Sequence, residues 1–277
     1  AGQGSINGFA TIGAAGSSES DLRYGADGTM TKGADVVGES KVGIQADYII
    51  NAAWSVTAQA VLKPMMDDRE RLGVTGEWLF ASYHVNDAVA VRFGKLRLPL
   101  FMYSEQLEVG KAYSMARLPQ EMYGMTPINA YNGVDVLSKF EVGDDGELTV
   151  QPYVGMARFD GRNTMPAGFP GYSAGQQAYN TFEADIIKGL NVQYVGAEGH
   201  LKLRAGYLAA NLKDVDGMTT NMATMFGQDG YSANNVDASF ASLGAQYRAG
   251  NTSITAEYGQ RRIDSASFAQ TDGYYVT

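Results

Sequence analysis

Apolar and polar residues alternate along most of this chain, which is the pattern of β-strands with two different faces. From residue 41 onward, Val42, Ile44 and Tyr48 fall on one face, while Gln45 and Asp47 fall on the other. The same period of two recurs at residues 54–63, 148–156, 201–209 and 253–261. The pattern predicts an all-β protein built from antiparallel strands.

The connections between the predicted strands alternate between short and long, and they separate eleven strands and the start of a twelfth. An up-and-down barrel that crosses a membrane sorts its connections in this way, because one rim carries tight turns and the other carries exposed loops. Short turns are predicted at residues 51–53, 86–87, 143–146, 197–199 and 248–251. Long connections are predicted at residues 16–39, 64–71, 98–129, 160–179, 211–234 and 264–271.

We therefore predict that residues 1–277 form a single transmembrane antiparallel up-and-down β-barrel in the cell outer membrane. A soluble all-β domain is the alternative, since its strands also alternate. The chain stops at "GYYVT", where a strand begins, and a closed sixteen-stranded barrel needs roughly 370 residues. We expect a C-terminally incomplete barrel of sixteen strands with about twelve represented; a twelve-stranded barrel that closes at this point is the alternative. The N-terminus lacks the signal-peptide pattern, so we expect any leader to have been removed.

Composition excludes several kinds of chemistry. The chain has no cysteine, which excludes disulfides, thiolate catalysis and cysteine-based metal sites. It contains no apolar run of the roughly 20 residues that a membrane helix needs. The formal net charge of −9 argues against a nucleic-acid partner. Because no calcium-loop or phosphate-loop spacing occurs either, we expect no cofactor and no metal ion.

The positions of the two histidines, His84 and His200, bear on whether the chain is an enzyme. Serine catalysis needs a histidine beside the nucleophile and a third group that orients it. Both histidines are predicted at the rim of the short turns, on different hairpins, and neither belongs to a His-x-Ser sequence. We expect no enzymatic activity, with an outer-membrane hydrolase as an alternative.

Charged residues on the polar faces of the strands predict the lining of a lumen. Cations that face acids across a lumen create a transverse field, which orients dipolar solutes and selects ions by sign. The alternative is that these charges pair with one another and only solvate the wall. The predicted lumen wall consists of Lys41, Asp47, Lys63, Glu77, Asp135, Glu183, Asp185, Lys202, Arg204, Glu257 and Arg261.

Several sequence motifs resemble those of Gram-negative outer-membrane porins, in the broad superfamily that includes phosphate-selective porins. They are "SINGFATIGAAG", "SKVGIQADY", "NGVDVLSKF" and residues 77–124, "EWLFASYHVNDAVAVRFGKLRLPLFMYSEQLEVGKAYSMARLPQEMYG". The resemblance covers most of residues 5–160. It implies a sixteen-stranded homotrimer whose third long loop, residues 98–129, folds into the lumen. Outer-membrane lipid, lipopolysaccharide and small hydrophilic solutes are the implied partners. Phosphate selectivity is not implied, because acids accompany the basic residues of this stretch.

The stretch at 92–124 is accordingly predicted to form a pore constriction of mixed charge. Pro99 and Pro119 would end regular strand pairing on either side of it. An extracellular loop folded on itself is the alternative. We expect passive diffusion of small hydrophilic or charged solutes, with a plugged barrel acting as a structural or adhesive surface protein as the alternative. The predicted constriction consists of Arg92, Lys95, Arg97, Glu105, Glu108, Lys111, Arg117 and Glu121.

Overall fold

Twelve strands form one antiparallel sheet, in which each strand is hydrogen-bonded to the next one along the chain. The structure is a computed structural model that describes residues 2–18, 33–38, 40–64, 72–113, 115, 117–164, 173 and 177–277. The predicted all-β, up-and-down architecture is confirmed. The strands of this sheet are β1 (Gln3–Thr11), β4 (Lys41–Ile49), β5 (Trp54–Pro64), β6 (Leu72–His84), β7 (Val89–Arg97), β8 (Ala130–Val142), β9 (Gly146–Thr164), β10 (Gln177–Gly196), β11 (Leu201–Asp214), β12 (Val236–Ala249), β13 (Thr252–Ile263) and β14 (Thr271–Val276).

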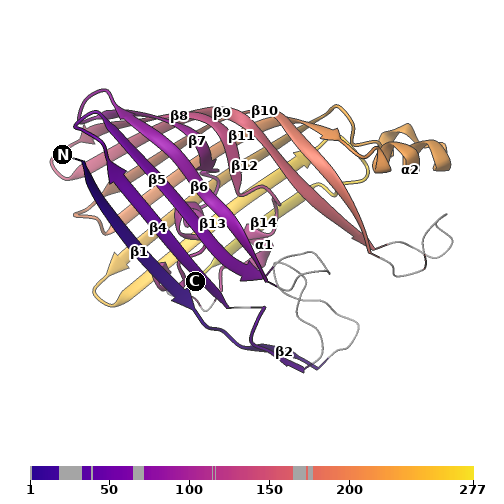
Figure 1. The fold of residues 1–277 in the computed structure, drawn as a ribbon, viewed down its shortest axis with the longest axis horizontal. Coiled ribbons are helices and arrows are strands. Elements are labelled where there is room, and N and C mark those ends of the chain that lie inside the picture. Colours follow the sequence, from indigo (N-terminus) through magenta and orange to yellow (C-terminus); the bar gives the residue numbers. More distant parts are fainter. Residues whose placement is uncertain are drawn as a thin grey trace.

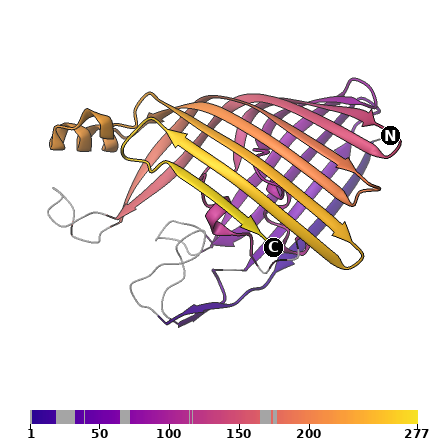
Figure 2. The same cartoon turned by 180° about the vertical axis from the view of Figure 1, so that it is seen from behind.

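The sheet curves into a barrel-like wall of tilted strands (Figures 1 and 2). Among the described residues, β1 pairs with β4 alone and β14 pairs with β13 alone. These two strands are therefore the edges of the sheet, and a twelve-stranded barrel closed by pairing of β1 with β14 is not what the structure shows.

Short turns and long connections alternate along the chain, and they lie at opposite ends of the strands. The first long connection contains a small hairpin of β2 (Ala15–Ser17) and β3 (Gly33–Asp35). The connection from β11 to β12 contains α2 (Met218–Phe226) and η3 (Asp229–Tyr231), and α2 projects beyond the strand ends (Figure 1). The connections predicted at 160–179 and 211–234 are shorter than expected, because β9, β10 and β11 continue into them. Most of the connection predicted at 64–71 lies outside the described residues.

The convex face of the sheet carries an apolar band. Side chains of this kind on the outside of a β-barrel face lipid. The rings of Trp54 and Tyr83 lie 4.9 Å apart between centroids, tilted by 44°, next to the short turns, where an interfacial aromatic girdle is expected. No described helix is long and apolar enough to cross a membrane. Large exposed side chains of this band include Ile6, Val42, Ile44, Tyr48, Val74, Phe93, Val134, Val154, Leu190, Leu203, Tyr207, Leu243 and Tyr258.

On β9–β13, the concave face is divided into an apolar half near the long loops and a polar half near the short turns. The apolar half is a buried core that includes Ala184, Ile187, Leu208, Leu212 and Phe240. Burying one such side chain stabilises the fold by about 1.5–3 kcal/mol. The same core contains side chains from the connection between β7 and β8, namely Leu98, Leu100, Phe101, Met122 and Met125.

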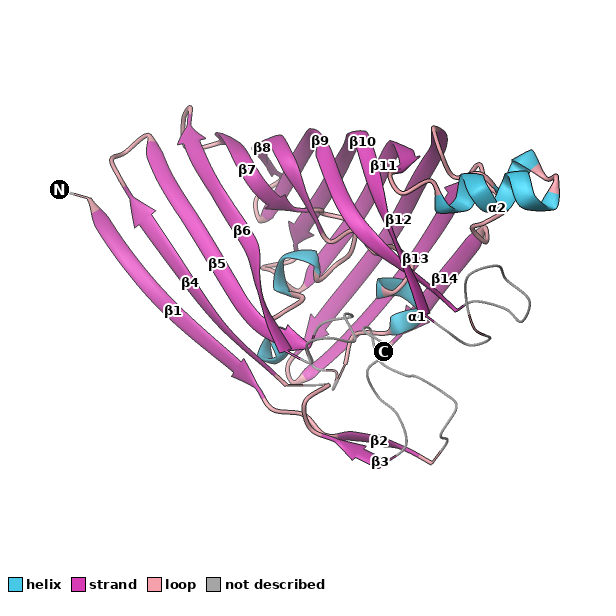
Figure 3. Cartoon of the chain, turned by 45° about the vertical axis from the view of Figure 1, so that its right-hand side comes forward, coloured by secondary structure: helices cyan, strands magenta, loops and turns pink. Residues whose placement is uncertain are grey.

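Residues 98–129, which connect β7 to β8, lie on the concave side of the sheet. They contain η1 (Ser104–Gln106), η2 (Gly110–Ala112) and α1 (Gln120–Tyr123). Figure 3 shows these short helices inside the curve of the wall. Apolar burial therefore holds this segment, called loop 98–129 below, against β9–β13.

Candidate functional site

Glu257 on β13 anchors the first arm of loop 98–129. Its Oε1 accepts the backbone N–H of Met102 at 2.6 Å, and its Oε2 accepts the hydroxyls of Tyr123 at 2.7 Å and Tyr275 at 2.5 Å. The side chain is buried beneath the loop. Burial and the neighbouring carboxylate raise the pKa of Tyr123, so this phenol keeps its proton and remains a donor. Glu257 faces inward, but it holds the loop instead of lining open space.

Strand β12 makes further contacts with the same arm. Ser242 Oγ donates to the carbonyl of Leu100 at 2.6 Å. Gln246 Nε2 donates to the hydroxyl of Tyr103 at 2.6 Å, and to Thr255 Oγ1 at 2.9 Å. All five residues are buried, so these bonds replace contacts with water and fix the loop at this position.

The returning arm of the loop is held by Arg261 on β13. Its NH1 donates to the carbonyl of Met125 at 2.6 Å, and its NH2 donates to the carbonyl of Ala269 at 3.1 Å. Gly273 on β14 lies so close to the carbonyl of Glu121 that a Cβ would collide with it. The glycine allows the loop to approach β14, and Arg261 faces inward as a contact of the loop.

At Glu108, the far end of the loop reaches the opposite wall of the curved sheet, on the same concave side. Lys41 Nζ lies 3.1 Å from Glu108 Oε2, and Lys63 Nζ lies 2.8 Å from Oε1. Lys63 also pairs with Glu77 at 2.7 Å, and Arg97 NH1 pairs with Glu77 at 2.9 Å. Burial disfavours ionisation of Glu108, but the two ammonium groups outweigh it and lower its pKa to about 2. Three cations and two carboxylates therefore lock this end to β4–β7.

These anchors show that loop 98–129 crosses the concave side from β12–β14 to β4–β5. Close to Glu108, Gly110 approaches β1, where an added Cβ would lie 2.9 Å from Thr11 Oγ1. The loop is thus attached near both edges of the sheet.

A chain of polar side chains runs across the inner face from β7 to β11. Arg92 donates through Nε and NH2 to the two oxygens of Asp135, at 2.9 and 2.7 Å. Gln151 Nε2 donates to Asp135 Oδ2 at 2.8 Å, and Asn191 Nδ2 donates to Gln151 Oε1 at 3.3 Å. Arg204 Nε donates to Asn191 Oδ1 at 2.8 Å. We call these five residues the polar chain.

The inner face of β4 and β5 is hydrophilic as well. Asp47 accepts hydrogen bonds from Thr57 at 2.8 Å and from Gln45 at 3.0 Å. Gln59 donates to Gln45 at 2.9 Å. Hydrogen-bonding side chains therefore line both walls of the concave face on the side of the short turns, which is the periplasmic side in barrels of this class.

Three charged groups near the loop make no ion pair within the part of the chain that the structure describes. Glu105, in η1, is exposed, and Lys202 is half-buried on β11. Arg204 is buried and makes its recorded hydrogen bond through Nε alone. The loop therefore carries an exposed acid, and the inner face of β11 carries two cations, on the same concave side of the sheet.

Lys95, predicted in the constriction, lies on the outer face of the sheet. It is exposed, and it pairs in register with Leu79, which is 61% exposed. Gly94 has a φ of +131°, a conformation that favours glycine and distorts β7 beside Lys95. The prediction for Lys95 was wrong, because the strand turns this side chain away from the loop.

Glu183 and Asp185, predicted in the lumen wall, also face outward. They pair with Arg158 at 3.3 Å and with Lys213 at 2.5 Å, on the exposed side of β9 and β11. A bulge between Ala184 and Ile187 adds a residue to β10, so inward and outward positions exchange there. The prediction for Glu183 and Asp185 was wrong, because the odd-numbered residues of β10 face outward before the bulge and inward after it.

The other predicted constriction residues lie on or next to loop 98–129. Arg117 is half-buried, and Glu121 is exposed in α1. The side chain of Lys111 lies outside the part that the structure describes.

The histidines bear on the alternative of a hydrolase. Ser55 Oγ and His84 Nε2 lie 3.5 Å apart on β5 and β6, where Ser55 is half-buried and His84 is exposed. Among the described residues, no third group forms a hydrogen bond with the imidazole ring of His84. His200 lies elsewhere and contacts the carbonyl of Arg248 at 2.8 Å. The arrangement lacks the orienting group of a catalytic triad.

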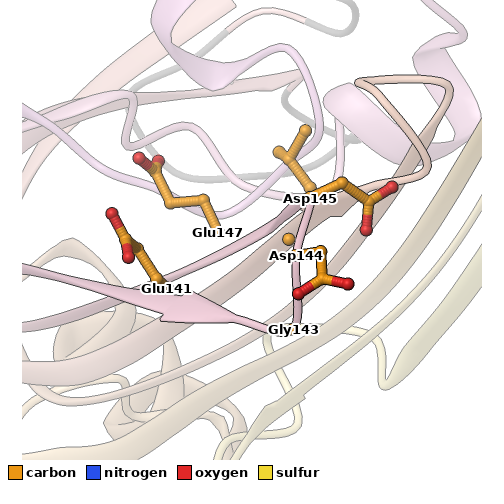
Figure 4. Close-up of a pocket in the computed structure, with 7 residues that line it drawn as sticks. Glu141, Gly143, Asp144, Asp145 and Glu147 are labelled. Carbon is orange, nitrogen blue, oxygen red and sulfur yellow. The ribbon is translucent and has the colours of Figure 1, made fainter.

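An acidic turn at the end of β8 borders a surface pocket (Figure 4). Glu141 and Glu147 are paired in register, and Asp144 and Asp145 form the turn between them. Lys139 neutralises part of this charge by pairing with Glu147 at 3.3 Å. The pocket is an exposed part of the rim and lies away from loop 98–129.

The fold is similar to those of solved outer-membrane proteins. The outer membrane channel DcaP of Acinetobacter baumannii matches with a TM-score of 0.50 and 11% identity, over 94% of this chain and 64% of DcaP. This chain thus spans about two thirds of the length of DcaP. The trimer form of OmpT, an outer membrane protein of Vibrio cholerae, has a TM-score of 0.41 and 14% identity, over 100% of this chain and 82% of OmpT.

A Pseudomonas aeruginosa FadL homologue has a TM-score of 0.27 and 14% identity, over 100% of this chain and 86% of its own. No protein-family model matches the sequence, and comparison with curated proteins finds no similar sequence. The likeness to DcaP and the apolar outer band identify the fold as that of an outer-membrane β-barrel, which confirms the predicted location.

Proposed function

We propose that this protein is an outer-membrane porin, through which small hydrophilic or charged solutes diffuse passively past loop 98–129. The observation that carries the proposal is the hydrophilic lining of the concave face on the side of the short turns. The polar chain crosses this face from β7 to β11, and Gln45, Asp47 and Gln59 line it on β4 and β5. A wall of this kind favours water and ions over lipid. The passage itself needs no catalysed step.

Two further points support a channel. The chain resembles Gram-negative porins in the motifs of residues 5–160, and the solved structure of DcaP is described as an outer membrane channel. A homotrimer in contact with outer-membrane lipid and lipopolysaccharide is part of the proposal. Phosphate selectivity is not, because Arg97 is neutralised by buried acids and Lys95 faces outward.

A plugged barrel that serves as a structural or adhesive surface protein is the second candidate. It is favoured by the apolar core between loop 98–129 and β9–β13, which fills the loop-side half of that wall. The two candidates differ in whether the polar half of the concave face connects past the loop.

Single-channel recording in planar bilayers separates the two candidates. The purified, folded protein is expected to produce ohmic current steps in KCl. Inserted protein that produces no steps would support the plugged barrel and contradict the porin. Assaying the same preparation for ester hydrolysis, with a His84→Ala variant beside it, tests the hydrolase alternative. We expect equal background rates in both.

A further inference from the structure

The outer face of β10–β13 carries an open apolar groove of about 370 Å³. Ala205 on β11 and Ala241 on β12 are diagonal neighbours in the register, and their methyl groups form its floor. A methylene group is about as large as a water molecule, which takes about 30 Å³ in the liquid, so roughly a dozen methylenes fit. The larger side chains that rim the groove are Leu190, Val192, Tyr207, Leu243 and Tyr258.

The outer face becomes charged one register row beyond the groove, on the side of the long loops. The row of Lys188, Ala209, Ser239 and Arg262 crosses from β10 to β13. It is the next outward-facing row after that of Leu190, which lines the groove. A cation therefore stands at each end of this row, with two small side chains between them.

The two cations of this row differ in their partners. Arg262 pairs with Asp272 at 3.0 Å. Lys188 is exposed, and its ammonium group makes no ion pair or hydrogen bond within the described part of the chain. Residues 165–172 and 174–176, in the connection that leads into β10, contain no acid. The end of the groove nearest the long loops is therefore positively charged.

Lys188 lies at the level of the lipid headgroups. Gly196, at the short-turn end of β10, follows Lys188 by eight residues. At about 3.3 Å per residue and a tilt of about 40°, this separation is about 20 Å along the membrane normal, against an apolar band about 25 Å tall. The ion pairs of Glu183 and Asp185 on the outer face lie beyond this level. An unpaired lysine is costly at the middle of a bilayer but costs little near its boundary with water.

We propose that the groove and Lys188 form a binding site for lipopolysaccharide, with an acyl chain over Ala205 and Ala241 and a phosphate at Lys188. The long loops of barrels of this class are extracellular, so the site faces the leaflet that contains this lipid. The inference rests on the lipid contact included in the proposed function, but it does not depend on the passage of solutes.

The chemistry of the site favours a lipid with phosphate monoesters over the other possible occupants. A phosphate monoester carries a charge of about −1.5 to −2 at neutral pH, more than the single charge of a phospholipid diester, and pairs more strongly with an ammonium group. A lipid of no net charge fills the groove but leaves the charge of Lys188 uncompensated. A second copy of the chain would bury Lys188 in a protein interface, where a charge without a partner is costly.

Native mass spectrometry of the purified, folded protein in neutral detergent tests the proposal. Lipid A, phosphatidylglycerol and phosphatidylcholine are added separately, and the concentration that gives half-maximal binding of one lipid per subunit is measured. We expect lipid A to bind most tightly and phosphatidylcholine most weakly. Phosphatidylglycerol or phosphatidylcholine that binds as tightly as lipid A would overturn the assignment.

Two pairs of variants locate the site. Lys188→Gln should weaken the binding of lipid A about fivefold, the effect of one lysine at a membrane surface. Lys95→Gln removes an exposed cation from the outer face of β7 and is the matched control, which should leave binding unchanged. Equal effects of these two substitutions would contradict the role of Lys188.

Ala241→Trp should fill the groove and weaken the binding of lipid A, whereas Ala46→Trp, on the outer face of β4, should not. If Ala241→Trp dissociates subunits and leaves lipid binding intact, the groove holds a second copy and the proposal is wrong. Single-channel recording of the unmodified protein separately decides whether the barrel conducts, so failure of the lipid site and failure of the porin are distinguishable.

Discussion

Replacing Glu257 by alanine removes the carboxylate that holds loop 98–129 against β13. Two of its three hydrogen bonds go to the loop, at 2.6 Å to the Met102 N–H and at 2.7 Å to the Tyr123 hydroxyl. A hydrogen bond to a charged group contributes about 1.5–3 kcal/mol, so the two together contribute about 3–6 kcal/mol. Because water replaces part of this in a solvated lumen, we expect about 3 kcal/mol, which raises the population of the undocked loop about a hundredfold.

Hydrogen–deuterium exchange of the folded protein measures this change. Amides of loop 98–129 should exchange about a hundredfold faster in Glu257→Ala, as expected for a local opening that costs less free energy. Amides of β4–β6 should be unaffected. Glu183→Ala, which removes a carboxylate from the outer face, is the matched control and should leave the loop protected. Unchanged protection of the loop in Glu257→Ala would refute the anchoring role.

Three further predictions concern the charges of the wall and loop. Arg97→Ala leaves Glu77 short of a buried partner and should cost about 3–5 kcal/mol of stability, seen as a lower unfolding temperature; an unchanged temperature would contradict it. The pKa of Glu108 is about 2 in the folded protein, below the value of about 4.3 in an unfolded chain. The ionised carboxylate therefore stabilises loop docking fully above about pH 4.3, and this stabilisation is lost as the pH falls through about 2. Loop amides should lose protection between about pH 4 and pH 2, and Glu108→Gln, although less protected throughout, should lose this pH dependence. Glu183→Gln with Asp185→Asn should leave the reversal potential in a KCl gradient unchanged, because both side chains face outward; a shift would place them in the path.

The alternation of apolar and polar residues predicted the inward-facing side chains correctly wherever a strand is regular. Lys41, Asp47, Lys63 and Asp135 all lie on the inner face expected from it. It failed at Glu183, because a bulge shifts every residue on one side of it to the opposite face. Nothing in the sequence of residues 183–189, "EADIIKG", predicts that extra residue.

The path of loop 98–129 was harder to predict from the sequence than the faces of the strands. Its mixture of aromatic residues, methionines and charges indicated a segment that packs while facing water, but its partners come from β12 and β13, more than a hundred residues later. Ser242 and Gln246 were therefore not predicted as contacts of the loop. Glu257 was identified as inward-facing, yet its role as an anchor depends on contacts that only the fold brings together.

Cysteine accessibility tests most directly whether loop 98–129 lines the solute path. The chain contains no cysteine, so Glu105→Cys introduces a single thiol on the loop. Lys95→Cys places a single thiol on the outer face and serves as the control. A charged, water-soluble thiol reagent added during single-channel recording should reduce the current of Glu105→Cys in a step and leave that of Lys95→Cys unchanged. Unaltered current through Glu105→Cys channels, with modification verified by mass spectrometry, would contradict the account.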